Sequence, residues 1–220
     1  GISPSLMTST LYPLYYNFFR SIGCTVVLGD EVIQAGMERK AASFCYPAEI
    51  SHGYTASLIG KDPDVYFLPH VRSMPVDKHM DSNQTCPFIQ AEPYYLRATF
   101  RELKGKKVLS PVLRFDKGYE QARGAFLGMA LTLGVEKRVA DQAYSVAVKA
   151  QESLLTEFRR LGQQALEALD DDHREVAVVL FGRPYNAFSS GGNMGIPHKF
   201  SSRGYRVIPM DFLPATDDVP

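Results

Sequence analysis

The sequence predicts an α/β protein with an open, mostly parallel, Rossmann-like sheet and the start of a second Rossmann-like lobe. Short apolar runs rich in β-branched residues alternate with longer segments of helical periodicity, as in parallel α/β sheets. One long polar segment of helical periodicity, residues 136–169, interrupts this alternation before a further strand–helix–strand pattern. We therefore expect three parts: an α/β lobe over 1–135, a long helical connection over 136–172, and a partial second α/β lobe over 173–220.

Start and stop signals support the predicted helices. Residues 5–22 carry helical periodicity that Gly23 ends, and Pro13 is tolerated there only in a first turn or as a kink. Residues 46–60 form a second helical segment, opened by Pro47 because proline suits the first turn of a helix. The other predicted helices, in chain order, are 30–38, 117–134, 136–169 and 191–204.

The predicted strands are short and apolar, as in a sheet that is buried on both faces. The clearest of them is EVAVVLFG, at 175–182. Functional groups in such sheets gather at the carboxyl ends of the strands. We therefore expect function in Pro69–Met80 and Arg183–Asn193, which each follow a strand. The remaining predicted strands are 24–28, 64–69, 107–113 and 205–210.

Charge and cysteine content narrow the class of protein. The chain has 24 Lys and Arg against 24 Asp and Glu, so it lacks the basic excess of a nucleic-acid-binding protein. It contains no apolar run of about 18 residues and no secretory signal. Three cysteines are too few and too uneven for a secreted disulfide framework, which favours the reducing cytoplasm. The start GISPSLM, without an initiator Met, indicates a segment of a longer protein.

Cys45 and Cys86 stand at two similar predicted helix starts, in CYPAE and CPFIQ. The unpaired N–H groups of a helix amino terminus favour a thiolate, the form of cysteine that binds iron or zinc. The alternative is that each thiol simply packs as a small apolar group. The repetition of the pattern favours metal binding for these two, whereas Cys24 lies within an apolar run and is expected to be packing.

Histidines near the two thiols suggest a zinc site, but helix geometry argues against one. His52 follows Cys45 by seven positions, and His79 precedes Cys86 by seven. Seven positions along a helix rise about 10 Å, whereas zinc lies only about 2 Å from each ligand. We therefore expect His52 to be packed or hydrogen bonded, or to be a polar group that faces a cleft. Two thiols are also too few for a four-iron cluster, so further ligands must come from outside this segment.

A glycine-rich loop, FGRPYNAFSSGGNMGIP at 181–197, follows a predicted strand and enters a predicted helix. Its glycines permit a close approach to an anion, and the guanidinium of Arg183 matches a carboxylate or phosphate. The loop fits neither the P-loop nor the dinucleotide fingerprint, and it serves equally well as a structural connection. The candidate cofactor-binding residues here are Arg183, Gly191, Gly192 and Asn193.

Motifs along nearly the whole chain carry a resemblance to a known family. They are GISPSL, LYPLYYNFFRSIGCTVVL, CYPAEISHGY, DVYFLP, TCPF, LSPVL and GRPYNAF…NMGIP. Together they resemble the domain of unknown function in large proteins related to the 2-hydroxyglutaryl-CoA dehydratase activator, labelled CoA-substrate-specific enzyme activases. The resemblance implies a fold like that of the dehydratase subunits. It also implies a [4Fe–4S] cluster on cysteine thiolates, and a separate ATP-hydrolysing activase domain that delivers a low-potential electron for radical dehydration of a 2-hydroxyacyl-CoA.

The resemblance carries over to Cys45 and Cys86, which match the family's cysteine positions, but not to Cys24. The chain departs from the family at Glu49, where Lys is common, and at Tyr54 and Asn186, where His is common. No acid–base role is therefore assigned to these three positions.

The leading hypothesis is an iron–sulfur-associated domain that acts in low-potential electron transfer or radical 2-hydroxyacyl-CoA dehydration. The expected partners are the ATP-binding activase domain of the same polypeptide and an acyl-CoA substrate, with no nucleic acid or membrane. The segment alone is expected to be inactive. Two alternatives stay open: a non-catalytic docking module of the same multidomain protein, and a thiol redox switch between Cys45 and Cys86.

Overall fold

The structure confirms the mixed α/β class, and its strands are short and parallel. The computed structural model describes residues 1–43, 45–76, 83–169, 176–187 and 189–214. Three strand pairs are present in these residues, β1–β3, β2–β4 and β5–β6, and all are parallel. The strand bounds are β1 Val65–Phe67, β2 His70–Val71, β3 Lys107–Leu109, β4 Val112–Leu113, β5 Ala177–Leu180 and β6 Arg206–Pro209.

Single-residue bridges extend the β1–β3 pair without forming a continuous open sheet in the described residues. Ile2 bridges to Leu28 on one side and to Phe67 on the other, both in parallel orientation. The predicted strand at 24–28 is therefore wrong as an element, since only this bridge forms there. The Ile2 amide donates to the Val27 carbonyl at 2.8 Å, so the chain start occupies the position between 24–28 and β1.

The helices agree with the prediction best where proline and glycine mark their ends. The predicted helix at 46–60 is present with those bounds, and α7 covers most of the predicted helix at 136–169. Helices α5 and α8 were not predicted, whereas α4 begins at the predicted helix start after Cys86. The bounds are α1 Thr8–Ser21, α2 Gln34–Met37, α3 Tyr46–Gly60, α4 Pro87–Gln90, α5 Glu92–Thr99, α6 Arg123–Thr132, α7 Lys137–Glu167, α8 Pro184–Ala187 and α9 Ile196–Ser201, with 3-10 turns η1 Arg101–Leu103, η2 Tyr119–Ala122 and η3 Met210–Phe212.

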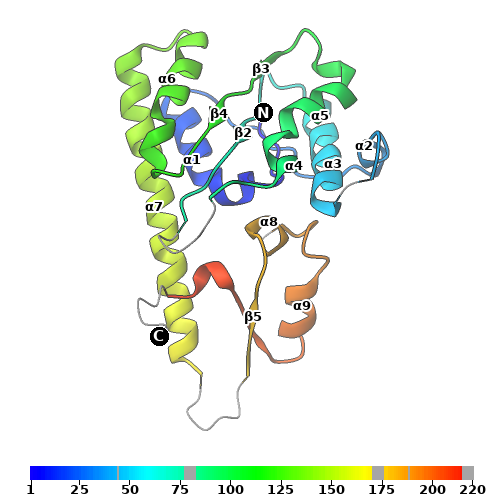
Figure 1. Ribbon diagram of the computed structural model, residues 1–220, viewed down its shortest axis with the longest axis vertical. Helices are drawn as coiled ribbons and strands as arrows, with labels where there is room; N and C mark the ends of the chain where they lie inside the picture. The colour runs from blue at the N-terminus through cyan, green and yellow to red at the C-terminus, as the bar shows by residue number, and fades with distance from the viewer. Residues whose placement is uncertain (44, 77–82, 170–175, 188, 215–220) are drawn as a thin grey trace.

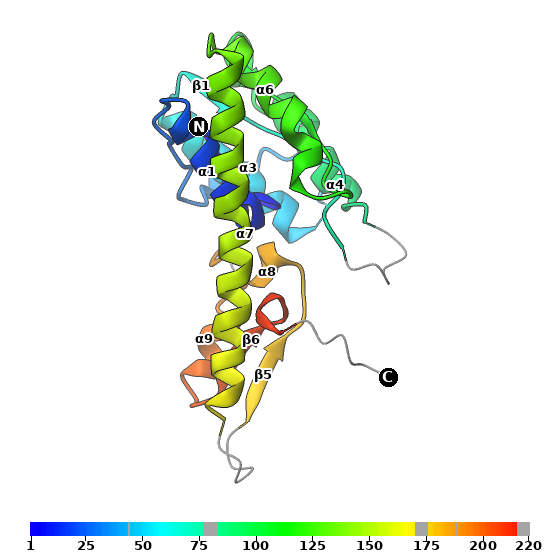
Figure 2. The same ribbon diagram turned by 90° about the vertical axis from the view of Figure 1, so that its left-hand side faces the viewer.

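Helix α7 runs along the length of the molecule and carries two groups of elements (Figures 1 and 2). The amino-terminal half of α7 packs against α1 and α6, in what we term the upper part, residues 1–135. Its carboxyl-terminal half contacts η3 and β6 of what we term the lower part, the described residues from 176 to 214, which also holds β5 and α9. The tip of the lower part that points upward, at α8, faces the ends of α3 and α4 (Figure 1).

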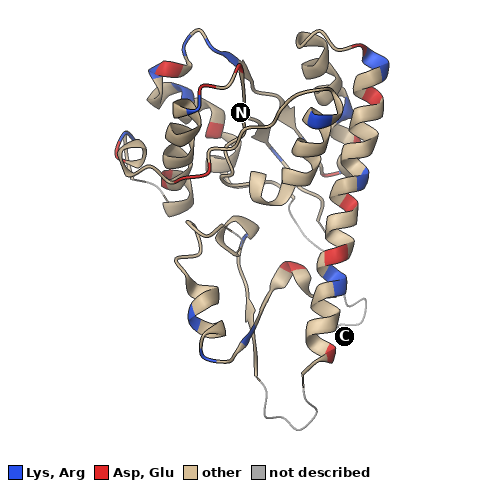
Figure 3. Ribbon diagram, turned by 180° about the vertical axis from the view of Figure 1, so that it is seen from behind, with Lys and Arg blue, Asp and Glu red and all other residues tan. Residues whose placement is uncertain are grey.

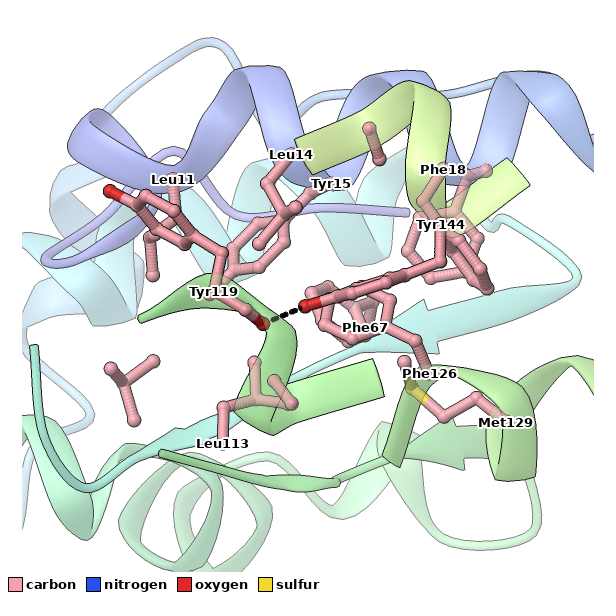
Figure 4. Packing of buried hydrophobic residues seen from close by; sticks show 14 of the residues in the cluster. Leu11, Leu14, Tyr15, Phe18, Phe67, Leu113, Tyr119, Phe126, Met129 and Tyr144 are labelled. Atoms are coloured by element: carbon pink, nitrogen blue, oxygen red, sulfur yellow. Dashed lines mark hydrogen bonds between the residues drawn. The ribbon is translucent and has the colours of Figure 1, made fainter. Parts of the chain in front are cut away.

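The main core lies between α1, α6, α7 and the strands of the upper part. Helix α1 contributes one face to this core, with apolar side chains at helical spacing. The ring of Phe18 meets that of Phe126 edge-on at 4.8 Å, and Phe126 packs against Tyr144 at 4.8 Å. The Tyr144 hydroxyl donates to the Tyr119 carbonyl at 2.5 Å (Figure 4), which pairs the one polar atom of that buried ring.

The lower part is attached through a close contact on α7. Phe158 of α7 stacks on Phe212 of η3 with ring centroids 4.2 Å apart. Gly162, one turn further, is buried, and a Cβ built on it would clash with the Phe212 backbone carbonyl. Charges of both signs alternate along the exposed surface of α7 (Figure 3). Among the described residues, no helix has both the length and the apolar character required to cross a bilayer.

Candidate functional site

Cys45 lies immediately before α3, as the sequence predicts. Its backbone is extended, and its carbonyl accepts the amides of Ala48 and Glu49 at 2.9 and 3.1 Å. Pro47 occupies the first turn, where its missing N–H has no cost. The thiol is exposed and free. Cys45 is therefore presented to its surroundings from the start of a rigid 15-residue helix.

Cys86 lies immediately before α4 and is fixed by the edge of the sheet. The Thr85 amide donates to the Arg72 carbonyl at 3.0 Å, and its hydroxyl donates to the Val71 carbonyl at 2.5 Å. Pro87 then starts α4, and the free thiol of Cys86 is half-buried. Both predicted helix starts that carry a cysteine are thus confirmed.

The two thiols share two tyrosine neighbours. Tyr95, on α5, and Tyr185, on α8, each lie within electrostatic range of both Cys45 and Cys86. Burial raises the pKa of each of these tyrosines, and for Tyr185 the adjacent guanidinium of Arg183 partly offsets the rise. Side chains from the starts of α3 and α4, from α5 and from α8 therefore lie within electrostatic range of one or both thiols, and we term this group the thiol cluster: Cys45, Cys86, Tyr95, Arg183 and Tyr185.

Arg183 connects the lower part to this cluster. Its Nη1 donates to the Tyr185 hydroxyl at 3.0 Å, and its guanidinium also interacts with the Cys86 side chain. These contacts, with Tyr185 as the larger, raise the pKa of Arg183. The sequence predicts Arg183 as a contact to an anion, and the structure places it against a thiol that becomes an anion when it loses its proton.

The other candidate residues of the glycine-rich loop make hydrogen bonds and contacts that stabilise the conformation of the loop itself. The amides of Gly192 and Asn193 both donate to the Ser189 carbonyl, at 2.9 and 2.8 Å. The Asn193 side-chain oxygen accepts the Gly195 amide at 2.9 Å. Gly191 packs against α3, since a Cβ there would lie 3.1 Å from the Tyr54 hydroxyl. Contact of these residues with a cofactor stays a prediction.

Cys24 and His52 both lie in packed surroundings. Cys24 is half-buried against the main core, and that burial raises the pKa of its thiol. His52 is 1% exposed, its Nδ1 lies 2.9 Å from the Ala48 carbonyl, and its ring stacks on Tyr95 at 5.3 Å. Burial lowers the pKa of His52. Of the alternatives predicted for His52, the packed, hydrogen-bonded one is confirmed, and His79 lies outside the described residues.

A buried carboxyl group next to the thiol cluster was not predicted. Glu92, at the start of α5, is 7% exposed and accepts a hydrogen bond from the Ser5 hydroxyl at 2.6 Å. Ser3 in turn pairs with Ser5 at 2.9 Å. Burial raises the pKa of Glu92 to about 7. Nothing in the sequence distinguishes it from an exposed acid in a first helical turn, because its burial depends on the distant Ser5 segment.

The donor atoms of the thiol cluster suit iron in type but do not complete a ligand set. Thiolates are the usual protein ligands of iron–sulfur clusters. Within the part of the chain that the structure describes, no three His, Cys, Asp or Glu side chains are grouped so as to hold a metal ion. Two thiols can therefore supply part of a cluster's ligands, and the tyrosines and Arg183 surround that part.

A family comparison matches residues 1–213, which is nearly the whole chain, and the family is described as a CoA enzyme activase uncharacterised domain. The chain belongs to this family. The match confirms the resemblance found in CYPAEISHGY, TCPF and GRPYNAF, and these motifs place the thiol cluster inside the family's domain. No curated protein and no solved structure matches the chain.

Proposed function

We propose that this activase-family domain supplies two thiolates, Cys45 and Cys86, to an iron–sulfur centre completed by ligands from outside residues 1–220. The observation that carries the proposal is that the two thiols, 41 positions apart, stand before separate helices and share Tyr95 and Tyr185 as neighbours. A bound [4Fe–4S] cluster would supply low-potential electron transfer.

The surroundings of the thiols support this role. Tyr185 and Arg183 come from the lower part, so its position determines what surrounds Cys86. A guanidinium next to a thiolate stabilises the negative charge, and hydrogen bonds to cluster sulfurs tune the reduction potential. Arg183 thus lies next to a proposed ligand thiol of the centre. The partners in this proposal are an ATP-hydrolysing activase domain and an enzyme that acts on an acyl-CoA.

The test is iron and acid-labile sulfide analysis of the full-length protein, prepared without oxygen. Cys45→Ser/Cys86→Ser is compared with Cys24→Ser, the matched control, because Cys24 is a free thiol whose charged neighbour is the amino terminus and not a member of the thiol cluster. We expect the double variant to lose about one cluster's worth of iron and Cys24→Ser to retain it. Equal iron in all three proteins would contradict the proposal.

A second candidate function is a docking module without thiol chemistry. It is favoured by the absence, among the described residues, of three grouped metal-ligating side chains. Under this reading the double variant keeps its iron and still binds the activase domain. Formation of a Cys45–Cys86 disulfide on mild oxidation, read by mass spectrometry, would instead favour the redox switch, since all three thiols are free in the structure.

A further inference from the structure

We propose that Arg72 and Arg114 form a binding site for a phosphate group at the carboxyl ends of β2 and β4. These strands are parallel and lie side by side (Figure 1). Ligands of parallel α/β sheets bind outside the carboxyl ends of the strands. The ligand class is a phosphate dianion, either free or carried by a small organic molecule. The site does not depend on iron, so it is independent of the proposed cluster.

The strand register places the two arginines next to each other. Val71 pairs with Leu113, and the Arg72 amide continues the ladder by donating to the Leu113 carbonyl at 2.8 Å. Arg72 and Arg114 are therefore the next pair in register, with backbones about 5 Å apart.

The burial pattern places both arginine side chains on the same face. Val71 and Leu113 are buried in the main core, whereas Arg72 and Arg114 are exposed, as alternation along a strand requires. Both guanidinium groups therefore project from the face opposite the core.

Neither guanidinium has an ion pair or a hydrogen bond to another side chain among the described residues. The carboxylate of Asp116, two residues after Arg114, accepts a hydrogen bond from the Ser73 hydroxyl at 2.7 Å, which lowers the pKa of Asp116. Like charges on directly opposed strand positions are unfavourable. A phosphate dianion bound between the two guanidinium groups would remove that repulsion. Its oxygens also match the planar arrangement of the guanidinium N–H donors.

The backbone of Arg72 is also bonded to the segment that leads to Cys86. Segment 83–85 borders β2 on its other edge, through an antiparallel bridge between Gln84 and Ser73. The Thr85 amide donates to the Arg72 carbonyl, and Cys86 is the next residue. The Cys86 side chain packs against the main core, whereas the two guanidinium groups project from the opposite face, so the phosphate site is separate from the thiol.

The experiment is titration of the iron-free full-length protein with inorganic phosphate and, separately, with adenosine 5′-diphosphate, followed by calorimetry at low salt. Arg72→Gln and Arg114→Gln are compared with Arg101→Gln, the control, which removes another exposed arginine from η1. Each site variant is expected to weaken binding roughly tenfold or more. The double variant is expected to bind phosphate only slightly more weakly than either single variant, because both guanidinium groups hold the same phosphate.

The outcomes separate the two sources of phosphate. Tighter binding of the diphosphate by tenfold or more identifies an organic ligand, and equal binding identifies free phosphate. Loss of binding in Arg101→Gln to the same extent, or no binding of either probe to the wild type, overturns the proposal. Thermal unfolding of each variant without ligand checks that the fold is intact. Phosphate should raise the melting temperature of Arg101→Gln but not of Arg72→Gln.

Discussion

The side-chain amide of Gln151, on α7, pairs with the backbone of α1 at Leu14. The Leu14 amide donates to Gln151 Oε1 at 3.3 Å, and Gln151 Nε2 donates to the Thr10 carbonyl at 2.9 Å. Pro13, inside α1, cannot donate the usual helical bond, and its ring disturbs the turn before it. The fully buried Gln151 thus stabilises the helix turn that Pro13 weakens, and it fixes α1 against α7.

Gln151→Met should destabilise the protein by about 2 kcal/mol or more, because a buried backbone donor and acceptor lose their partner. In a Pro13→Ala background the same change should cost less, since alanine restores the helical bond and its geometry. Urea unfolding of the four proteins measures the coupling. The exposed Gln163→Met, on the same helix, is the control and should change stability by less than about 0.5 kcal/mol. Equal losses in both backgrounds would show that Gln151 acts without regard to Pro13.

Gly162→Ala should loosen the lower part from α7. The added Cβ meets the Phe212 carbonyl, which is backbone and cannot rotate away, so the stack of Phe158 on Phe212 must shift. We expect a loss of about 1–3 kcal/mol, as for overpacking, and faster proteolysis within the lower part.

The control for this change is Gly128→Ala on α6. Gly128 is exposed, and a Cβ there meets nothing within 4 Å. Alanine is a better helix former than glycine, so Gly128→Ala should raise stability by about 0.5–1 kcal/mol. If both variants gained stability alike, the close approach of α7 and η3 would have no structural role.

The sequence could predict elements whose signals are local. Helix α3 has its bounds as predicted because Pro47 and the residues after it encode a helix start. The segment at 24–28 was wrong because strand formation depends on partners. Ile2 pairs with this segment only through a bridge at Leu28. From the sequence alone, Gly162 is a residue that disfavours the long helix in which it lies. Its close contact with the Phe212 backbone, which leaves no room for a Cβ, explains why glycine stands there.

The candidate site shows the same division. Cys45 and Cys86 could be predicted at helix starts because proline follows each of them closely in the sequence. Their shared neighbours could not be predicted, because Tyr185 reaches them only through the position of the lower part relative to α3 and α4. Glu92 was missed for the same reason, since its burial depends on Ser5, which lies 87 positions earlier in the sequence.

Glu92→Gln should make the protein more stable at neutral and alkaline pH. Burial raises the pKa of Glu92 from its usual 4.5 to about 7, so the folded state favours the protonated acid. Its contribution to stability is fully present below about pH 4.5 and is lost as the pH rises through about 7. The loss amounts to roughly 3 kcal/mol at about 1.4 kcal/mol per unit.

The measurement is urea unfolding of wild type and Glu92→Gln at several values between pH 4.5 and pH 8. The two proteins should be similar at the acid end, and the difference should grow in favour of the glutamine variant towards pH 8. The exposed Glu31→Gln serves as the control and should follow the wild-type curve. If the free energies of unfolding of wild type and Glu92→Gln ran parallel from pH 4.5 to pH 8, the pKa of Glu92 would not be raised in the folded protein.

The three thiols should differ in their rates of alkylation. Cys45 is exposed, Cys86 is half-buried beside Arg183, and Cys24 is half-buried against the core with its thiol pKa raised by burial. Only the thiolate reacts with iodoacetamide, so Cys45 should be modified first and Cys24 last. Peptide mass spectrometry after timed quenching gives the three rates. In iron-loaded full-length protein, Cys45 and Cys86 should be protected together while Cys24 keeps its slow rate, because a shared centre occupies both ligands at once. Protection of only one of the two thiols would contradict a shared centre.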